Sequence, residues 1–285
     1  MADESKPKSP KSGGPDLLSV AGLAVALAGI LGGLVLEGGK LRDVSQLTAA
    51  IIVLGGTAGS VMVSTPGFVL KGALRRLGGV FHDAAPPLRM LIEELTAYSS
   101  KARKTGLVSL EDEADQIADP FLKKALTLAV DGTDLQEIRN MLELEISLAE
   151  HDAEAEAKVF ESAGGYAPTI GIIGAVLGLI QVMKNLANID EVGHGIAVAF
   201  VATVYGVALA NLFLLPAASK IKARAQAETR RREMILEGVS GIVEGLNPKL
   251  VQAKLESFMH AVPEKAAKGA ANGSAKGSVA QPAEA

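Results

Sequence analysis

Two long uncharged stretches, almost end to end, set most of the limits on how this chain can fold. They cover residues 162–183 and 195–219. Each is long enough to cross a hydrocarbon core of ~30 Å, which takes about 20 residues of α-helix. Only a short polar loop separates them, so the pair predicts a transmembrane hairpin over residues 162–219.

A second pair of uncharged stretches lies nearer the N-terminus. Residues 17–36 contain no charge, and neither do residues 44–70, whose centre is the apolar segment 49–63. No small-residue cleavage site follows the first stretch, so we expect a retained span rather than a signal peptide. The chain has 48% hydrophobic and 21% charged residues and a mean hydropathy of +0.29, because apolar blocks alternate with charged ones. We therefore predict an all-α integral membrane protein with four transmembrane helices, the first two within residues 16–66.

Basic residues gather on one side of the predicted spans. They follow the second and the fourth span, whereas both short hairpin loops contain few of them. Since Lys and Arg are enriched in cytoplasmic loops, we expect both hairpin loops outside and both termini in the cytoplasm. The residues concerned are Lys71, Arg75, Arg76, Lys220, Lys222, Arg224, Arg230, Arg231 and Arg232.

This orientation makes residues 67–161 a cytoplasmic helical domain between the second and third spans. One helix is expected over about 84–104, ending at Gly106, which suits a helix C-terminus. Ser109 with Asp112 predicts a capping box for a short second helix, which is expected to end before Pro120.

A third helix of this domain is expected to start at Thr133 with Gln136 and to run toward the membrane. Residues 220–260 are predicted to leave the membrane as a cytoplasmic amphipathic helix. Residues 1–15 and 261–285 are too rich in Lys, Ser, Pro, Ala and Gly to bury a core, and we expect disordered tails.

Small residues recur four apart within the predicted spans. In lipid, helices associate largely through close backbone approach at such small faces, so tight packing is predicted, including packing between subunits. The sets are Gly29 and Gly33, Gly55 and Gly59, Gly174 and Gly178, and Ala202, Gly206 and Ala210.

Two prolines stand at similar depth, near the cytoplasmic ends of the third and fourth spans. Pro168 and Pro216 each remove an N–H from the helix and crowd the carbonyl four residues earlier. We predict a hinge there that passes movement in the membrane to the cytoplasmic domain. The alternative is that the two prolines only set fixed bends.

None of the four uncharged stretches contains Asp, Glu, Lys, Arg or His. Proteins that move ions by themselves normally place an ionisable group within the membrane. If this chain helps to conduct ions, another subunit must therefore supply the carboxylate. The polar groups that the stretches can offer are those of Gln181, Thr203, Tyr205 and Asn211.

Nothing in the sequence points to an enzyme. The chain has no cysteine, and its four histidines are scattered. No nucleophile arrangement, metal-ligand set or nucleotide-binding loop is evident, so we predict no catalytic residue, no metal and no cofactor, and no binding of nucleic acid.

Four motifs, in their order and spacing, resemble the MotA family, the larger subunits of bacterial flagellar stators within the MotA/TolQ/ExbB group. The resemblance covers roughly residues 16–258. The motifs are EGG at 37–39, GGT at 55–57, APTIGIIGAVLGLI at 167–180 and ATVYGVALANLFLLP at 202–216.

The resemblance implies a subunit of the inner membrane that forms an ion channel with MotB. In that family five MotA subunits surround a MotB dimer, whose aspartate binds the ion, and the complex pushes the rotor protein FliG. The family's conserved prolines match Pro168 and Pro216, and its FliG-contacting Arg and Glu match Arg103 and Glu111. The implied function is to couple ion flow to torque, which serves swimming and chemotaxis.

The resemblance also bears on the coupling ion. Members that use sodium usually carry Thr in the third span where this chain has Ala175, while Thr203 matches a Thr of the fourth span. Ala175 lacks a hydroxyl that would help to replace the hydration shell of sodium. We therefore expect protons rather than sodium ions.

Two other functions are weighed against the stator. ExbB and TolQ energise other complexes, but they typically have three spans and an external N-terminus, unlike the four spans predicted here. A stand-alone solute transporter would need a charged or substrate-binding group inside the membrane, which the uncharged stretches lack.

Overall fold

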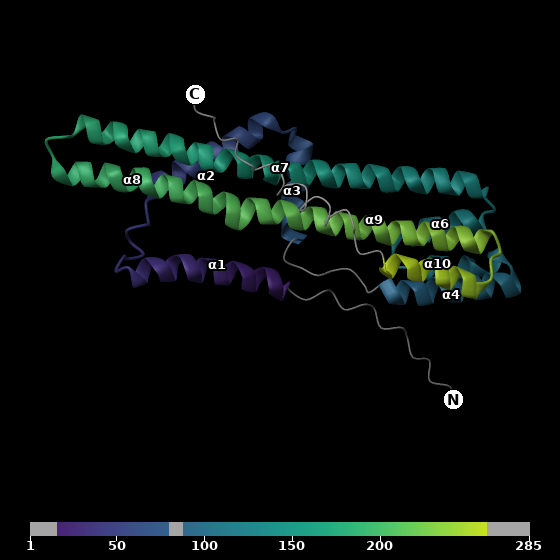
Figure 1. The fold of residues 1–285 in the computed structure, drawn as a ribbon. Coiled ribbons are helices and arrows are strands. Elements are labelled where there is room, and N and C mark those ends of the chain that lie inside the picture. The colour runs from purple at the N-terminus through teal and green to yellow at the C-terminus, as the bar shows by residue number, and fades with distance from the viewer. Residues whose placement is uncertain (1–15, 80–87, 261–285) are drawn as a thin grey trace, which may run out of the picture. The chain divides into compact units, whose positions relative to one another are not determined.

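The computed structural model describes residues 16–79 and 88–260, and in this part of the chain all regular structure is helical, without a β-strand (Figure 1). The predicted all-α class is therefore confirmed. Both predicted tails, and the first residues of the helix expected from Ala84, lie outside the described residues.

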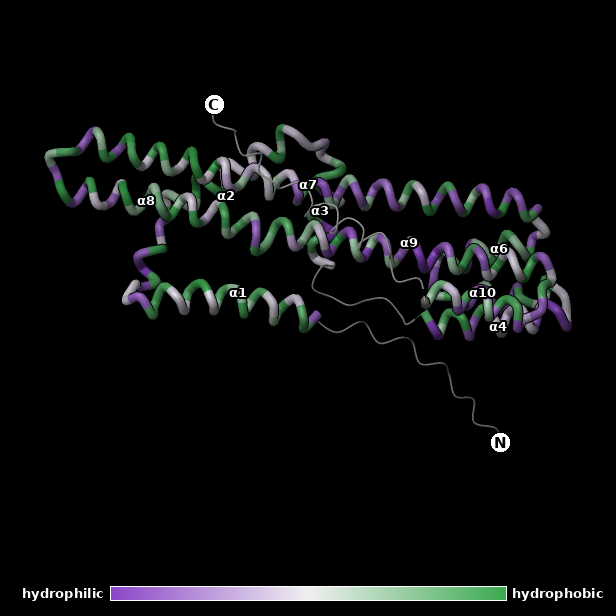
Figure 2. Tube along the Cα trace, in the orientation of Figure 1, coloured by the Kyte–Doolittle hydropathy of each residue, from purple (hydrophilic) through white to green (hydrophobic). Residues whose placement is uncertain are grey.

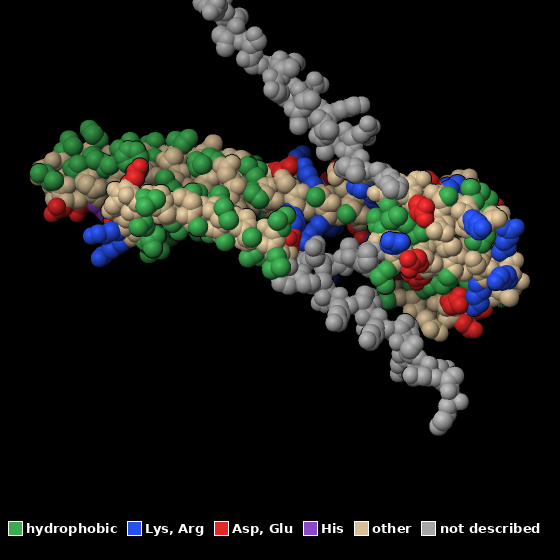
Figure 3. Space-filling view, turned by 60° about the horizontal axis from the view of Figure 1, so that its bottom comes forward, with side chains coloured by type: hydrophobic (Ala, Val, Ile, Leu, Met, Phe, Trp, Pro, Cys, Tyr) green, Lys and Arg blue, Asp and Glu red, His purple; other side chains and the backbone are tan. Residues whose placement is uncertain are grey.

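Four described helices are long and apolar enough to cross a membrane. The first two are α1 (Leu17–Leu36) and α2 (Leu47–Ser64). The third lies in α7 (Leu135–Lys184), and the fourth begins with α8 (Ile189–Ala208). Figure 2 shows the hydrophobic residues along α1, α2, α8 and the half of α7 beside α8. In Figure 3 the hydrophobic side chains cover the end of the surface formed by the α7–α8 hairpin.

The chain folds into two compact units. One, here called the membrane unit, contains residues 16–79 and Ile146–Thr229. The other, here called the helical unit, contains residues 88–145 and 230–260. Since α7 and α9 (Leu215–Val243) contribute to both, the units do not follow the domain ranges predicted from sequence.

In the membrane unit α2 is followed by α3 (Gly67–Gly79). One apolar cluster joins α2 and α8, with Ala49, Val53, Val201 and Ala202 buried in it. A second cluster joins α2, α3, α7 and α9; it contains Val61, Ala73, Ala157, Val159, Phe160, Ala163, Ala218 and Ile221.

The helical unit contains α4 (Leu88–Thr105), a 3₁₀ turn η1 (Leu107–Leu110), α5 (Glu111–Gln116), α6 (Pro120–Val130) and α10 (Pro248–His260). Its fully buried side chains give it a core of its own, and each contributes about 1.5–3 kcal/mol by burial. They include Leu95, Leu110, Leu122, Leu126, Ile138, Leu142, Met234, Ile235 and Leu255.

The predicted end of the helix expected over about 84–104 is confirmed, but both predicted caps are wrong. α4 ends before Gly106, whose φ of 87° suits glycine. Ser109 does not cap α5; its hydroxyl donates to the carbonyl of Gly106 at 2.6 Å, within the 3₁₀ turn. At α7 the cap is Asp134 rather than Thr133, because its carboxylate accepts from the N–H of Gln136 at 2.9 Å.

One helix was missed. Pro120 was expected only to end a helix, yet it is the first residue of α6. A proline suits that position because its missing N–H would have no partner there. The Asp119 carboxylate caps α6 by accepting from the N–H groups of Phe121 and Leu122 at 2.8 and 3.0 Å.

The third span and the helix leading to it are one continuous helix of 50 residues, α7. The fourth span passes from α8 through a π-helical segment η2 (Leu209–Leu214) into α9. The amphipathic helix expected over 220–260 is divided at Gly245, where a φ of 68° separates α9 from α10.

Candidate functional site

The backbones of α7 and α8 are in direct contact through their small residues. A Cβ built on Gly206 would lie 2.5 Å from the carbonyl oxygen of Ala167, and one on Gly178 would lie 2.8 Å from that of Gly195. On Gly171 it would lie 2.9 Å from the carbonyl oxygen of Ala202. The predicted close packing is therefore confirmed for these two spans, which lie side by side in Figure 1.

The glycine pairs predicted to pack in the first two spans make no such contact among the described residues. A Cβ on Gly29, Gly33, Gly55 or Gly59 would meet nothing within 4 Å. No residue of α1 is buried. These faces of α1 and α2 are therefore open to lipid or to another polypeptide.

The two predicted ion-pathway residues lie on the α7–α8 hairpin. The backbone of Thr203 lies against α7, since a Cβ on Gly171 would be 3.4 Å from its Cα. Its hydroxyl donates to the carbonyl of Ala199 at 3.3 Å, within its own helix. Ala175 is half-buried and follows Gly174, whose Cβ would meet Ala202. The structure thus brings both residues to one hairpin.

The other polar groups of the fourth span have structural partners. The Tyr205 hydroxyl donates to the carbonyl of Val44 at 2.5 Å and accepts from the N–H of Gln46 at 3.3 Å. It thereby fixes the α1–α2 loop to α8. The side-chain amide of Asn211 donates to the carbonyl of Val207 at 2.9 Å.

Thr57 is a polar residue of the membrane unit that sequence reasoning did not single out. Its side chain is buried and its hydroxyl has no hydrogen-bond partner in the described structure. It shares a buried face of α2 with Val53 and Val61. The sequence signal was its place in the GGT motif, where it was noted only as part of a resemblance.

The two prolines lie beside irregular backbone that meets across the helix pair. Pro168 lies inside α7, which continues through it. Pro216 directly follows Leu215, and the π-helical segment η2 ends at Leu214. A Cβ on Gly164, one turn before Pro168, would lie 2.6 Å from the Leu215 side chain. Pro168 and Pro216 therefore lie at similar levels along the helix pair.

An ionic contact fixes the start of α1. The Asp16 carboxylate caps α1 through the N–H of Ser19 and pairs with Lys220 of α9, while Arg224 lies 3.7 Å away. Hydrogen bonds from Lys220 and then Ser19 lower the pKa of Asp16 to about 2. Asp16 is thus charged at neutral pH, and this contact was not predicted.

The predicted rotor-contact residues belong to the helical unit. Arg103 lies in the last turn of α4 and Glu111 begins α5, with the η1 turn between them. Both are exposed, and neither takes part in an ion pair among the described residues. The neighbouring charges Lys101 and Glu113 pair with each other at 2.8 Å. Arg103 and Glu111 are therefore available to a partner.

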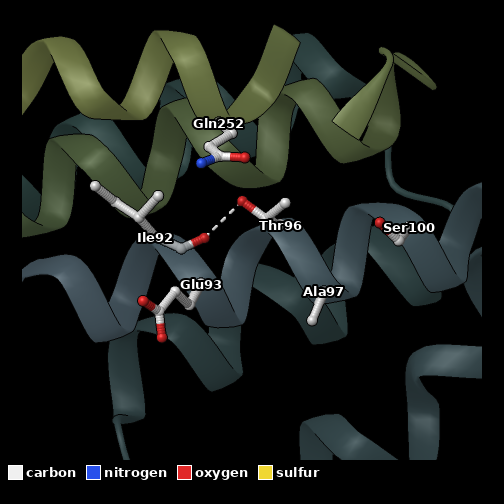
Figure 4. A pocket seen from close by; sticks show the side chains of 6 residues that line it. All are labelled: Ile92, Glu93, Thr96, Ala97, Ser100 and Gln252. Carbon is white, nitrogen blue, oxygen red and sulfur yellow. Dashed lines mark hydrogen bonds between the residues drawn. The ribbon is translucent and has the colours of Figure 1, made fainter. Parts of the chain in front are cut away.

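The helical unit also has a shallow hollow between α4 and α10, of about 310 Å³ (Figure 4). The hydroxyl of Thr96 donates to the carbonyl of Ile92 at 2.7 Å, and Glu93 lies 3.8 Å from Arg89. No group of three or more His, Asp or Glu side chains suited to a metal ion occurs among the described residues. The hollow is lined by Ile92, Glu93, Thr96, Ala97, Ser100 and Gln252.

Comparison with known proteins links both units to one family. Residues 113–234 match the family model described as MotA/TolQ/ExbB proton channel family, and residues 20–106 match the one described as Motility protein A N-terminal. Motility protein A of Bacillus subtilis is 34% identical over 250 residues, which cover 86% of this chain and 92% of the relative.

Solved structures agree. The structure of C. jejuni MotAB matches with a TM-score of 0.82 at 34% identity, over 85% of this chain and 95% of that chain. The flagellar MotAB stator complex from Bacillus subtilis matches with a TM-score of 0.78 at 33% identity, over 90% of this chain and 98% of that chain. The likeness therefore includes the membrane hairpins and the helical unit.

Proposed function

The chain belongs to the MotA/TolQ/ExbB proton channel family, and we propose from this that it is a flagellar motor stator subunit that couples proton flow to torque. The observation that carries the proposal is the match to two MotAB structures over nearly the full length of their chains. A subunit of this kind uses ion flow rather than a chemical reaction, so we assign it no catalytic residue.

The ion-binding carboxylate comes from a MotB-type partner. The uncharged stretches of the four spans hold no ionisable side chain, and an ion pathway through the membrane needs one. The family relationship further suggests five copies of the chain around a MotB dimer. The open small-residue faces of α1 and α2 support such an assembly, because they leave room for close contact with a neighbouring polypeptide.

We place the protein in the inner membrane with both termini and the helical unit in the cytoplasm. Basic residues support this orientation, because Lys71 and Arg75 follow α2, while Lys220 and Lys222 follow η2. The loops between α1 and α2 and between α7 and α8 then face outward.

The contact between Gly164 and Leu215 is the place where movement in the membrane passes to the cytoplasm. Helix hydrogen bonding is interrupted on both sides of it, by Pro168 in α7 and by η2 with Pro216 in α8–α9. One proton crossing 100 mV releases about 2.3 kcal/mol, a few times RT. That free energy is enough to shift the equilibrium between two helix arrangements of similar energy.

Arg103 and Glu111 form the contact with the rotor protein FliG. Both charges are exposed, and neither is used in an ion pair within the described chain, unlike Lys101 and Glu113 beside them. A partner with complementary charges would therefore gain two ion pairs without breaking any.

The coupling ion is the proton. Ala175 offers no side-chain oxygen, so of the two positions only Thr203 can supply a side-chain ligand to sodium. Sodium binding requires several oxygen ligands to replace water, whereas a proton needs only the partner's carboxylate.

Reconstitution tests the proposal directly. Vesicles that contain this chain together with a MotB-type protein should take up protons under an imposed potential, whereas vesicles with either protein alone should not. Selective cation flux through this chain alone would overturn the division of roles. At fixed potential and pH, motor speed should not depend on sodium concentration.

Charge reversal tests the rotor contact. Arg103→Glu and Glu111→Lys should each reduce torque while leaving proton uptake in vesicles unchanged, because the helical unit is outside the ion pathway. Arg89→Glu is a suitable control, since Arg89 is equally exposed but lies near the start of α4. Equal torque losses in all three variants would contradict a specific contact.

A further inference from the structure

Helix α3 has two different faces and directly follows a membrane span. Only Thr65 and Pro66 separate it from α2. Its inner face is packed within the membrane unit: Ala73 is fully buried, and Val69, Leu70 and Leu77 lie against the cluster that contains Phe160 and Ile221. The orientation of α3 is therefore fixed by its packing, and this determines which of its side chains face away from the membrane unit.

The outer face of α3 carries two large apolar side chains with two cations between them. Phe68 is 80% exposed and Leu74 is 60% exposed. Lys71 and Arg75 are exposed too, and the spacing of 68, 71, 74 and 75 places all four on one side of a helix. Exposed aromatic and aliphatic side chains of this size are expected to be covered by an apolar medium.

The two cations on this face are not used by the protein. The third basic residue of α3, Arg76, points the other way and pairs with Glu156 of α7. Lys71 and Arg75 have no ion pair among the described residues. Their charges are therefore available to a group outside the described residues.

The end of α2 indicates which partner is present. Met62 and Val63 are 67% and 91% exposed, which fits contact with lipid acyl chains at the end of a span. Since α2 ends at Ser64, α3 begins at the depth where hydrocarbon gives way to phosphate headgroups. Aromatic side chains favour this layer, and Lys and Arg extend their charges toward the phosphates.

We propose that the outer face of α3 binds anionic phospholipid, with the lipid phosphate between Lys71 and Arg75 and the acyl chains against Phe68 and Leu74. The positive pair complements the net negative charge that distinguishes an anionic lipid from a zwitterionic one. Each Lys or Arg near an anionic surface raises binding about five-fold. The proposal needs only the membrane placement of α2, so it stands apart from the stator function.

A fluorescent variant tests it, because the chain has no tryptophan. Phe68→Trp in the full chain places a single indole on this face, in a bilayer of zwitterionic lipid with a small fraction of brominated phosphatidylglycerol or brominated phosphatidylcholine. Quenching gives the relative binding constant of the two lipids. We expect phosphatidylglycerol to bind about five- to twenty-five-fold more tightly, and the preference to weaken at high salt.

The preference should fall to near unity when Lys71→Gln and Arg75→Gln are added. The matched control is Arg89→Gln with Lys249→Gln, two exposed cations of the helical unit, which should leave it unchanged. Equal binding of both lipids, an indole quenched by neither, or a preference that survives K71Q/R75Q would each overturn the proposal. Native mass spectrometry of the chain with Phe68 intact provides a second measurement, in which K71Q/R75Q should retain less anionic lipid.

Discussion

The contact between α7 and α8 makes a sharp prediction at Gly206. A Cβ there would lie 2.5 Å from the carbonyl oxygen of Ala167 and 3.1 Å from the Cα of Gly171, and contacts under 3.0 Å are essentially never seen for real Cβ atoms. Both obstacles are backbone atoms, which cannot rotate away as a side chain would. Gly206→Ala therefore has to push the two helices apart.

The cost follows from two opposing terms. Overpacking a well-packed site costs about 1–3 kcal/mol, and separation of the helices also weakens other close contacts along the pair, such as that of Gly178. Alanine recovers about 0.5–1 kcal/mol because it favours the helix over glycine. We expect a net loss of about 1–2 kcal/mol, or a Tm lower by roughly 2–8 °C.

Gly193→Ala is the matched control. Gly193 is also in α8, but a Cβ there would meet nothing within 4 Å, so this change should leave the Tm unchanged or raise it. The measurement is thermal unfolding of the full chain in one detergent, followed by the helical circular dichroism signal. If Gly206→Ala unfolds at the same temperature as Gly193→Ala, the close approach of the two backbones is wrong.

Three further predictions concern contacts that fix the ends of helices. Asp16→Asn should speed amide exchange in the first turn of α1. In the unchanged chain the same loosening should appear only as pH falls from about 4 toward 2. The reason is that the pKa of Asp16 is lowered from 3.8 to about 2, so its contribution to stability is complete above the pKa of the unfolded chain and is lost as pH falls through the folded pKa. Asp119→Ala removes both the α6 cap and the ion pair with Arg231, whose side chain is 14% exposed, so it should cost about 2–4 kcal/mol in chemical unfolding, against under ~0.5 kcal/mol for Asp115→Ala at the exposed pair with Lys123. Tyr205→Phe should cost about 1–2 kcal/mol and speed amide exchange at Gln46, and unchanged exchange there would argue against the hydroxyl bridge.

Local features of the sequence predicted the helices best where one physical requirement dominated. The four spans could be found because a membrane helix needs about 20 uncharged residues, a signal that no short stretch of soluble protein imitates. The end of α4 was found because Gly106 adopts a φ of 87°, which suits glycine. The cap at Thr133 was wrong because the neighbouring Asp134 caps α7 instead. The cap at Ser109 was wrong because its hydroxyl donates to Gly106 within the 3₁₀ turn, and no side chain caps α5.

Contacts between distant residues were not predictable in the same way. The sequence showed many charges near the ends of the spans, but nothing in it pairs Asp16 with Lys220 or Arg76 with Glu156. Nor could it separate the glycines that meet another helix, such as Gly171, from those in open space, such as Gly55. Small residues four apart look alike in sequence whether or not a partner helix is present.

The sequence by itself determined that the chain crosses the membrane through uncharged spans and that these stretches contain no Asp, Glu, Lys, Arg or His. Both follow from residue types and run lengths, because the cost of placing charge in hydrocarbon depends little on the rest of the fold. Only the tertiary structure decided that α7 is continuous for 50 residues, that a π-helical segment precedes Pro216, and that this segment ends against Gly164. These features depend on how helices far apart in the chain pack together, and packing depends on the shapes of both partners at once.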